Sequence, residues 1–163
     1  MLTSHDQVDR LDRMNDRVHR ASAVSVELFL AVISTTCGRL PVLSRLGKTA
    51  AVKQLIASRA WTDAALALIE LELPQWKIRR LVFEDGHWLC SLSEQVNMPL
   101  ELDDTVDASH AVLPLAILSA LIEVRCRAAA VMTAPPAVPL IRPSRNAASS
   151  FGDGVAVVCD NFC

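Results

Sequence analysis

The pair Asp85-Gly86 lies between two runs of alternating apolar residues, 76–84 and 87–93, and constrains the fold of this chain more than any other feature. Asp-Gly is typical of the two-residue type I′ turn, which requires positive φ angles at both central positions. The pattern therefore predicts an antiparallel β-hairpin. Its register is fixed by the turn, so that Glu84 faces His87.

This register gives the predicted hairpin two apolar faces. The stronger face gathers Leu81, Phe83, Trp88, Cys90 and Leu92, and ends with Arg79 opposite Leu92 and Lys77 opposite Glu94. On the other face Val82 pairs with Leu89, Arg80 with Ser91 and Ile78 with Ser93, which leaves the weaker apolar set Trp76, Ile78, Val82 and Leu89. Because both faces are apolar, we expect some cover on each of them.

A lone hairpin is marginally stable in water, so a third strand or a layer of helices must join it. After Gln95, apolar residues alternate with polar ones at Val96, Met98, Leu100 and Leu102, which predicts a third strand. Pro99 confines this strand to an edge. We therefore expect an α+β fold with a small three-stranded antiparallel meander, from about residue 76 to 102, packed against helices.

Apolar residues at helical spacing predict helices at 49–58, at 63–73 and from about 109 to 128. Thr62 or Asp63 is the expected N-cap of the second helix, and Pro74 ends it. Asp107 or Ser109 is the expected N-cap of the third. Pro114 fits that helix only if it begins at Leu113.

The segment from Ser4 to about Cys37 predicts one long helix or two helices in line. Apolar or small residues at 3,4 spacing form a stripe along it: Leu11, Met14, Val18, Ala21, Ser25, Leu28 and Val32. Charged residues flank the stripe at i,i+4 spacing. Two interpretations stand side by side: the stripe pairs with another helix, such as a copy of itself, or the helix lies across its own domain.

The chain divides into three predicted regions: a helical N-terminal arm (1–47), an α+β core (48–128) and a weakly ordered C-terminal tail (129–163). Four of the eight prolines fall between Pro135 and Pro143, and charged residues are sparse there. This composition is typical of an extension that does not form a second domain.

Charge and cysteine content exclude several classes of protein. A formal net charge of -2 gives no general attraction for nucleic acid or anionic lipid. The five cysteines are an odd number without the paired spacing of a disulfide scaffold or a zinc knuckle. The charged N-terminus is unlike a secretory signal, and the apolar stretches 21–37 and 111–122 are shorter than the ~20 residues of a membrane span. We expect a cytoplasmic protein with free thiols and no membrane insertion.

No run of residues forms a nucleophile elbow, a phosphate-binding loop or a zinc-binding helix motif. The acidic residues Asp103, Asp104 and Asp107 precede His110, a cluster that favours the N-terminus of a helix, where carboxylates oppose the exposed N–H groups. His87 and Cys90 are three apart on a strand and point to opposite faces. We therefore predict no catalytic residue, cofactor or metal ligand. An enzyme with an unrecognised site near Asp107 and His110 is one alternative.

The other alternative is a winged-helix regulator that binds nucleic acid. Two helices joined by a short turn precede a hairpin that carries Lys77, Arg79 and Arg80, which is the order of that motif. The second helix offers acidic residues where a recognition helix offers basic or amide side chains. We therefore do not expect nucleic acid to be a partner.

The stripe and the two-sided hairpin favour a non-enzymatic protein that associates with itself or with another protein. The weaker face of the hairpin and the start of the stripe supply the predicted interaction residues: Leu11, Met14, Val18, Trp76, Ile78, Val82 and Leu89.

Overall fold

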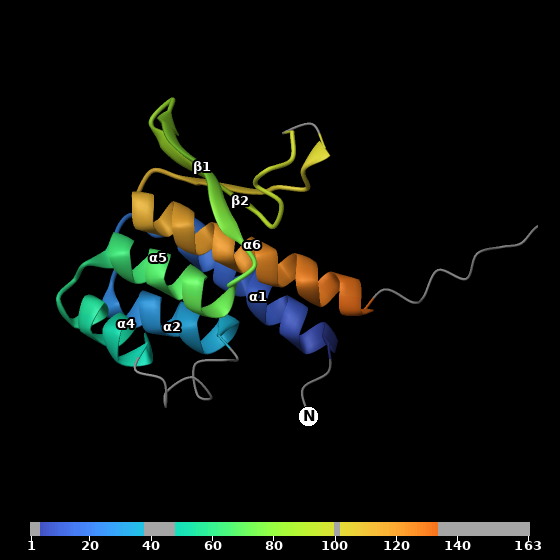
Figure 1. Ribbon diagram of the computed structural model, residues 1–163. Coiled ribbons are helices and arrows are strands. Elements are labelled where there is room, and N and C mark those ends of the chain that lie inside the picture. Colours follow the sequence, from blue (N-terminus) through green and yellow to red (C-terminus); the bar gives the residue numbers. More distant parts are fainter. Residues whose placement is uncertain (1–3, 38–47, 100–101, 134–163) are drawn as a thin grey trace, which may run out of the picture.

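A computed structural model describes residues 4–37, 48–99 and 102–133 of the chain. Within these ranges the chain forms five helices and one three-stranded antiparallel sheet (Figure 1). The helices are α1 (Ser4–His19), α2 (Val26–Thr36), α4 (Lys48–Ala57), α5 (Trp61–Glu72) and α6 (Leu113–Thr133); the strands are β1 (Lys77–Glu84), β2 (His87–Ser93) and β3 (Val106–His110). The predicted α+β class and the three-stranded meander are confirmed.

The hairpin turn forms where the sequence predicts it. Asp85 and Gly86 both have positive φ angles, of 50° and 81°, as a type I′ turn requires. From the turn down to Arg80 opposite Ser91, the observed register of β1 and β2 is the predicted one. The two-residue loop therefore fixed the pairing of this half of the hairpin.

A β-bulge between Ile78 and Arg80 shifts the register of the other half. Ile78 lies opposite Leu92, so the predicted pairing of Arg79 with Leu92 is wrong; Lys77 lies opposite Ser93, so the predicted Lys77–Glu94 and Ile78–Ser93 pairs are wrong as well. A bulge inserts one extra residue into one strand. Here it turns Ile78 toward the hydrophobic core and frees Arg79 to bind the loop that follows β2.

The third strand is not the predicted one. Val96, Met98 and Leu102 lie in the connection after β2 and are exposed. The third strand is β3, which pairs antiparallel with β2 and places Val106, Ala108 and His110 on the buried side. Apolar and polar residues alternate at 106–110, but this pattern is short and includes a histidine. In the connection after β2, polar residues between the apolar ones give the same alternation as a strand.

Helix α6 forms the centre of the molecule and contacts β2 and β3 on one side (Figure 1). It begins at Leu113, so Pro114 is its second residue, where a missing N–H costs no hydrogen bond. The predicted caps Asp107 and Ser109, and the predicted helix N-terminus at the acidic cluster, are therefore wrong because these residues belong to β3 or precede it. The run from Leu115 to Ile122 is buried throughout.

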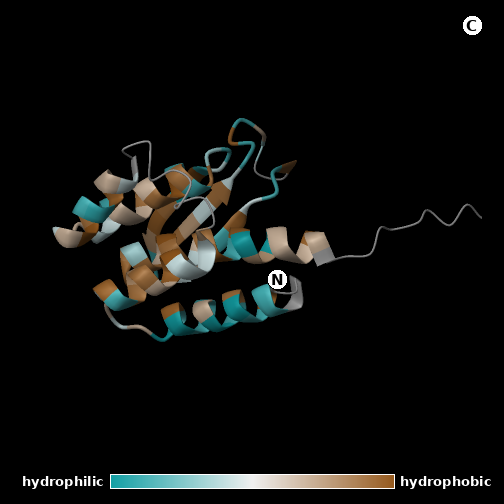
Figure 2. Ribbon diagram, turned by 90° about the horizontal axis from the view of Figure 1, so that it is seen from below, coloured by the Kyte–Doolittle hydropathy of each residue, from teal (hydrophilic) through white to brown (hydrophobic). Residues whose placement is uncertain are grey.

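The N-terminal segment forms two helices, and they are not in line: the chain turns back between α1 and α2 (Figure 1). α1 lies along α6. It presents a mostly hydrophilic surface outward, beside the more hydrophobic helices (Figure 2). The stripe residue Ser25 is the N-cap of α2, since its hydroxyl accepts the Leu28 N–H at 3.1 Å. Because Ser25 caps the start of a second helix, the residues at 3,4 spacing do not lie on one continuous helix.

Helices α4 and α5 lie close to their predicted positions. The N-cap position of α5 is Ala60, and no side chain caps the helix there, so the predicted caps Thr62 and Asp63 are wrong. Trp61 instead stacks on Phe29 of α2, with ring centroids 5.9 Å apart. The aromatic contact holds this end of the helix in place of a polar cap.

One hydrophobic core contains buried residues from all five helices and from β2 and β3. It therefore includes residues of both the predicted arm (1–47) and the predicted core region (48–128). α6 continues to Thr133, five residues beyond its predicted end at 128. The remainder of the predicted tail, 134–163, lies outside the described residues.

Candidate functional site

The seven predicted interaction residues fall into different environments. Leu11 and Val18 are buried, at 1% and 0% exposure, and Met14 packs against the same core. In the structure this part of the stripe covers α6 of the same chain. This agrees with the interpretation that the helix lies across its own domain. Trp76 and Ile78 are half-buried and also pack against the core. The remaining two, Val82 and Leu89, lie elsewhere.

Val82 and Leu89 lie directly opposite each other on the face of the sheet that points away from α6. Each is half-buried. Exposed polar residues surround them on the same face, among them Arg80 on β1 and Ser109 on β3. The structure thus brings together two of the predicted interaction residues as a small apolar patch, on the only face of the described sheet that no described helix covers.

Two aromatic residues near the hairpin turn form a second apolar surface, on the opposite face of the hairpin. Phe83 and Trp88 face each other across the strands, with ring centroids 5.2 Å apart at an interplanar angle of 51°. Phe83 is 56% exposed although it is on the α6 side of the sheet, because the hairpin extends beyond the helices (Figure 1). The alternation of the hairpin places Phe83 on the stronger apolar face, but alternation alone does not tell where the helices that cover this face end.

β1 is an edge strand: in the described sheet the strand order is β1-β2-β3. Its outer edge carries the N–H and C=O groups that β2 does not use, and such groups are a template for another strand. Arg80 and Glu84 lie along this edge strand and form an ion pair at 2.7 Å, with side chains 46% and 56% exposed. An exposed pair of this kind contributes little to stability, so both charges remain accessible to a partner.

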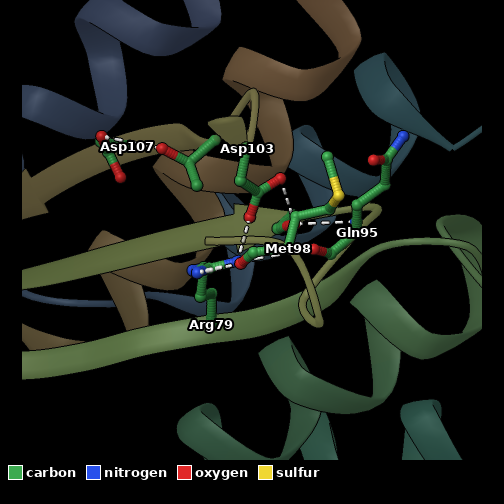
Figure 3. Close-up of polar contacts among 7 residues, drawn as sticks. Arg79, Gln95, Met98, Asp103 and Asp107 are labelled. Atoms are coloured by element: carbon green, nitrogen blue, oxygen red, sulfur yellow. Dashed lines mark hydrogen bonds and ion pairs between the residues drawn. The ribbon is translucent and has the colours of Figure 1, made fainter. Parts of the chain in front are cut away.

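At the end of the hairpin away from its turn, the Arg79 side chain lies at the centre of a group of polar contacts (Figure 3). The Arg79 guanidinium forms an ion pair with Asp103 and donates to the carbonyl oxygen of Met98 at 2.7 Å. The Ser93 hydroxyl donates to the second oxygen of Asp103 at 2.8 Å. The Asp103 side chain is only 2% exposed. These contacts fix the connection between β2 and β3, and they make Asp103 a structural residue.

Asp107 and His110, the pair proposed for an alternative enzyme site, are on opposite faces of β3. Asp107 is exposed, whereas His110 is 7% exposed and faces the core. Residues three apart on a strand point in opposite directions. The strand therefore separates these two side chains, and a joint role as an acid/base pair has no geometric support.

His110 is instead one wall of a surface pocket of about 440 Å³. Three histidines line the pocket, His19 from the end of α1, His87 from β2 and His110 from β3, together with Arg20. The rings of His19 and His110 are 6.4 Å apart between centroids. Among the residues that the structure describes, no group of three or more metal-binding side chains is placed to hold an ion. No local sequence pattern predicts this pocket, because its histidines are far apart in the chain.

The His110 ring has a structural hydrogen bond, since its Nδ1 accepts the N–H of Val112 at 2.9 Å. Burial lowers the pKa of His110 below its usual 6.5, and the neighbouring His19 lowers this pKa further. Contacts with backbone groups of Val18, His19 and Ala21 act in the opposite direction. The net effect favours the neutral ring at the junction of β3 and α6.

The lowered pKa predicts that acid destabilises the fold. The folded state disfavours the charged ring, so the contribution of His110 is present above about pH 6.5 and is lost as the pH falls through the lower pKa of the folded protein. His110→Asn keeps an acceptor near the position of Nδ1 but does not titrate. In urea titrations at several pH values, the wild type should lose more stability between pH 7 and pH 5 than this variant. If the wild type and His110→Asn lost the same stability between pH 7 and pH 5, His110 would not be a cause of the acid destabilisation.

The three described cysteines are poor nucleophiles. Burial raises the pKa of the thiols of Cys37, Cys90 and Cys126 to about 12 in each case. The carboxylates of Asp12 and Glu123 act in the same direction on Cys126. Because the thiolate is the reactive form, these residues lack the chemistry of a catalytic cysteine.

A buried ion pair links α5 to α6. The Arg125 guanidinium lies 2.7 Å from the Glu72 carboxylate, and the two side chains are 26% and 0% exposed. A small pocket of about 140 Å³ opens beside them, lined also by Trp76. The pair joins two core helices, so its role is structural.

The order expected of a winged helix is present, with α4, α5 and the hairpin in succession. α5, however, is a core helix whose buried residues include Leu68 and Ile69, and its two exposed residues are Asp63 and Glu70. A recognition helix must present donors to the bases and must tolerate the phosphates. The exposed surface of α5 has the wrong charge for this task.

Fold and surfaces together define a small α+β protein whose sheet is covered by helices on one face and exposed at the hairpin end of the other. Comparison with protein-family models, with curated proteins and with solved structures finds no match for this chain. None of the helices in the described part of the chain has both the length and the apolar character needed to cross a membrane.

Proposed function

We propose that this protein acts as a non-enzymatic association module that binds a protein partner through the outer face and the outer edge of its hairpin. The observation that carries the proposal is the position of Val82 and Leu89, an apolar pair on a sheet face that no described helix covers, next to the edge of β1 that no described strand pairs with. Apolar residues that stay partly accessible beside the edge of a described sheet are typical of protein interaction sites.

The chemistry of the described residues supports an association role over catalysis. Partial or full burial raises the pKa of the three described thiols, and the strand separates Asp107 from His110. Strand addition, by contrast, needs only an accessible backbone edge with apolar and charged side chains that fit the partner. β1 supplies the backbone edge, and β1 and its neighbour β2 supply the apolar and charged side chains.

The test compares the wild type with the double variant Val82→Thr/Leu89→Thr in the full-length chain. Threonine is favourable in strands, so the fold should persist while the apolar patch is lost. The control is Val131→Thr/Met132→Gln, which removes side chains that are 76% and 86% exposed at the end of α6.

Two quantities are measured for each protein: its mass in solution by light scattering, and the proteins that it retains from its native host. We expect association with a copy or with another protein in the wild type and in the α6 control, and its loss in the Val82/Leu89 variant. Association that is independent of Val82 and Leu89, or a wild type that associates with nothing, would refute the proposal. Circular dichroism verifies that each variant is folded.

A further inference from the structure

We infer that the partner at this surface is a second copy of the chain, and that the two β1 strands pair antiparallel about a twofold axis at Val82. This inference rests on the proposed function, since it names the partner for the same surface. Closed twofold dimers with the same surface on both subunits are the commonest protein assemblies.

The backbone of β1 limits which registers are allowed. In an antiparallel ladder, residues alternate between pairs that exchange hydrogen bonds and pairs that do not, and the pair beside a two-residue turn is of the first kind. The ladder positions of Glu84, Val82 and Arg80 therefore direct their N–H and C=O groups toward β2. Leu81 and Phe83 direct theirs to the outer edge, so a second strand must bond to these two residues.

Charge selects one of the allowed registers. Pairing about Val82 places Leu81 opposite Phe83 of the second copy, which satisfies the backbone requirement. The same register places Arg80 opposite Glu84 of the second copy, and, by symmetry, Glu84 opposite Arg80. Opposite charges in cross-strand pairs are stabilising and like charges are destabilising. If the twofold axis lay two residues nearer the bulge, Arg80 would face Arg80 of the second copy. In the allowed registers with the axis one residue to either side of Val82, Arg80 no longer faces Glu84.

The apolar residues also fit this register. Val82 meets Val82 of the second copy at the axis, beside Leu89 on the same face. On the other face Phe83, which is 56% exposed in one chain, meets the half-buried Leu81 of the other. The pairing covers the most exposed aromatic side chain among the described residues.

The surroundings leave room for a second chain. The hairpin projects away from the helices at its turn (Figure 1), and among the described elements β1 makes its principal contacts with β2. The usable edge runs only from the bulge at Arg80 to Glu84. So short an interface falls below the ~1,200 Å² of stable complexes, so we expect a weak dimer with a dissociation constant in the micromolar range.

The first experiment measures the mass of the full-length chain by light scattering or sedimentation from about 5 to about 500 μM, a range that brackets a micromolar dissociation constant. The proteins are the wild type and the single variants Arg80→Glu and Glu84→Arg. Each variant replaces two attractive cross-strand pairs with two repulsive ones. We expect the dissociation constant of each to rise at least about tenfold.

The matched control is a mixture of the two single variants. One chain then carries glutamate at both positions and the other arginine at both, so both cross-strand pairs become attractive. We expect the mixture to form a mixed dimer, and the double variant Arg80→Glu/Glu84→Arg to dimerise like the wild type. Both charges are exposed, and thermal melting verifies that the single variants remain folded.

The second experiment tests the register by disulfide formation under mild oxidation. At the axis the two copies of Val82 form a non-hydrogen-bonded pair with Cα atoms ~4.5 Å apart, within disulfide range. Val82→Cys should therefore cross-link two chains. Leu89→Cys is the control on the same face, because the two copies of that residue would be ~14 Å apart across three strand spacings. The unsubstituted chain measures cross-linking by the native cysteines.

The outcomes separate this inference from the proposed function. A wild type that stays monomeric at every concentration overturns self-pairing and leaves the edge to a different protein. A dimer that both single variants retain, or that Leu89→Cys cross-links as well as Val82→Cys does, overturns the register. The proposed function fails only if no association of any kind depends on Val82 and Leu89.

Discussion

Replacement of Leu11 by alanine is expected to lower the free energy of unfolding by about 3 kcal/mol, because it removes a fully buried side chain and leaves a cavity between α1 and α6. Leu11 is 1% exposed and belongs to the hydrophobic core. The loss should appear as a lower midpoint of urea denaturation with an unchanged slope. The variant should keep the association state of the wild type.

The matched control is Leu30→Ala in α2, where the same atoms are removed from a side chain that is 51% exposed. Its cost should stay below about 1 kcal/mol, since most of that side chain already contacts water. If Leu11→Ala costs no more than this control, or dissociates an oligomer without destabilising the chain, then the stripe on α1 contacts a partner and not α6.

Replacement of Arg125 by methionine is expected to lower the free energy of unfolding by about 3 kcal/mol, because a carboxylate in the protein interior loses its cation. The Glu72 side chain is 0% exposed, so water does not replace the guanidinium. The value is at the lower end of the usual range since the Arg125 side chain keeps 26% exposure. Chemical denaturation at neutral pH measures the loss.

Two further variants make this result specific. Glu72→Met/Arg125→Met removes both charges, and it should recover much of the stability because an apolar pair of similar volume often replaces a buried ion pair without loss. Arg20→Met breaks the surface pair with Asp16, whose side chains are 82% and 71% exposed, and should change stability by less than about 0.5 kcal/mol. A double variant as unstable as Arg125→Met would show that the charges are not the cause.

The elements that local sequence predicts well are those held by local interactions. The Asp85-Gly86 turn is one, because positive φ at both residues selects a single hairpin geometry. The start of α6 is predicted only in part: the expected start at about residue 109 is wrong, but Pro114 points to the observed start at Leu113, because proline is tolerated in the first turn of a helix and not deeper. The predicted interaction pair Val82 and Leu89 follows from the same turn, since a two-residue loop fixes which residues face each other.

The errors arise where a distant residue decides the local structure. The bulge in β1 depends on Asp103 and Met98, which lie beyond the hairpin and bind Arg79. The third strand depends on α6, which buries Val106 and Ala108, whereas the described residues of the other alternating segment, among them Val96, Met98 and Leu102, lie outside the sheet. The pocket of His19, His87 and His110 unites residues from three elements, and spacing in the sequence carries no sign of it.

By itself, the sequence determined the hairpin, its register near the turn, the positions of α4 and α5 and the α+β class, because turn geometry and apolar periodicity act over a few residues. Only the tertiary structure decided which apolar stripes are used within the chain. Leu11 and Val18 have the pattern of an interaction helix, yet α6 buries them. An amphipathic stripe indicates that a helix packs against another surface. The packing of the whole chain determines whether that surface belongs to the same chain or to another protein.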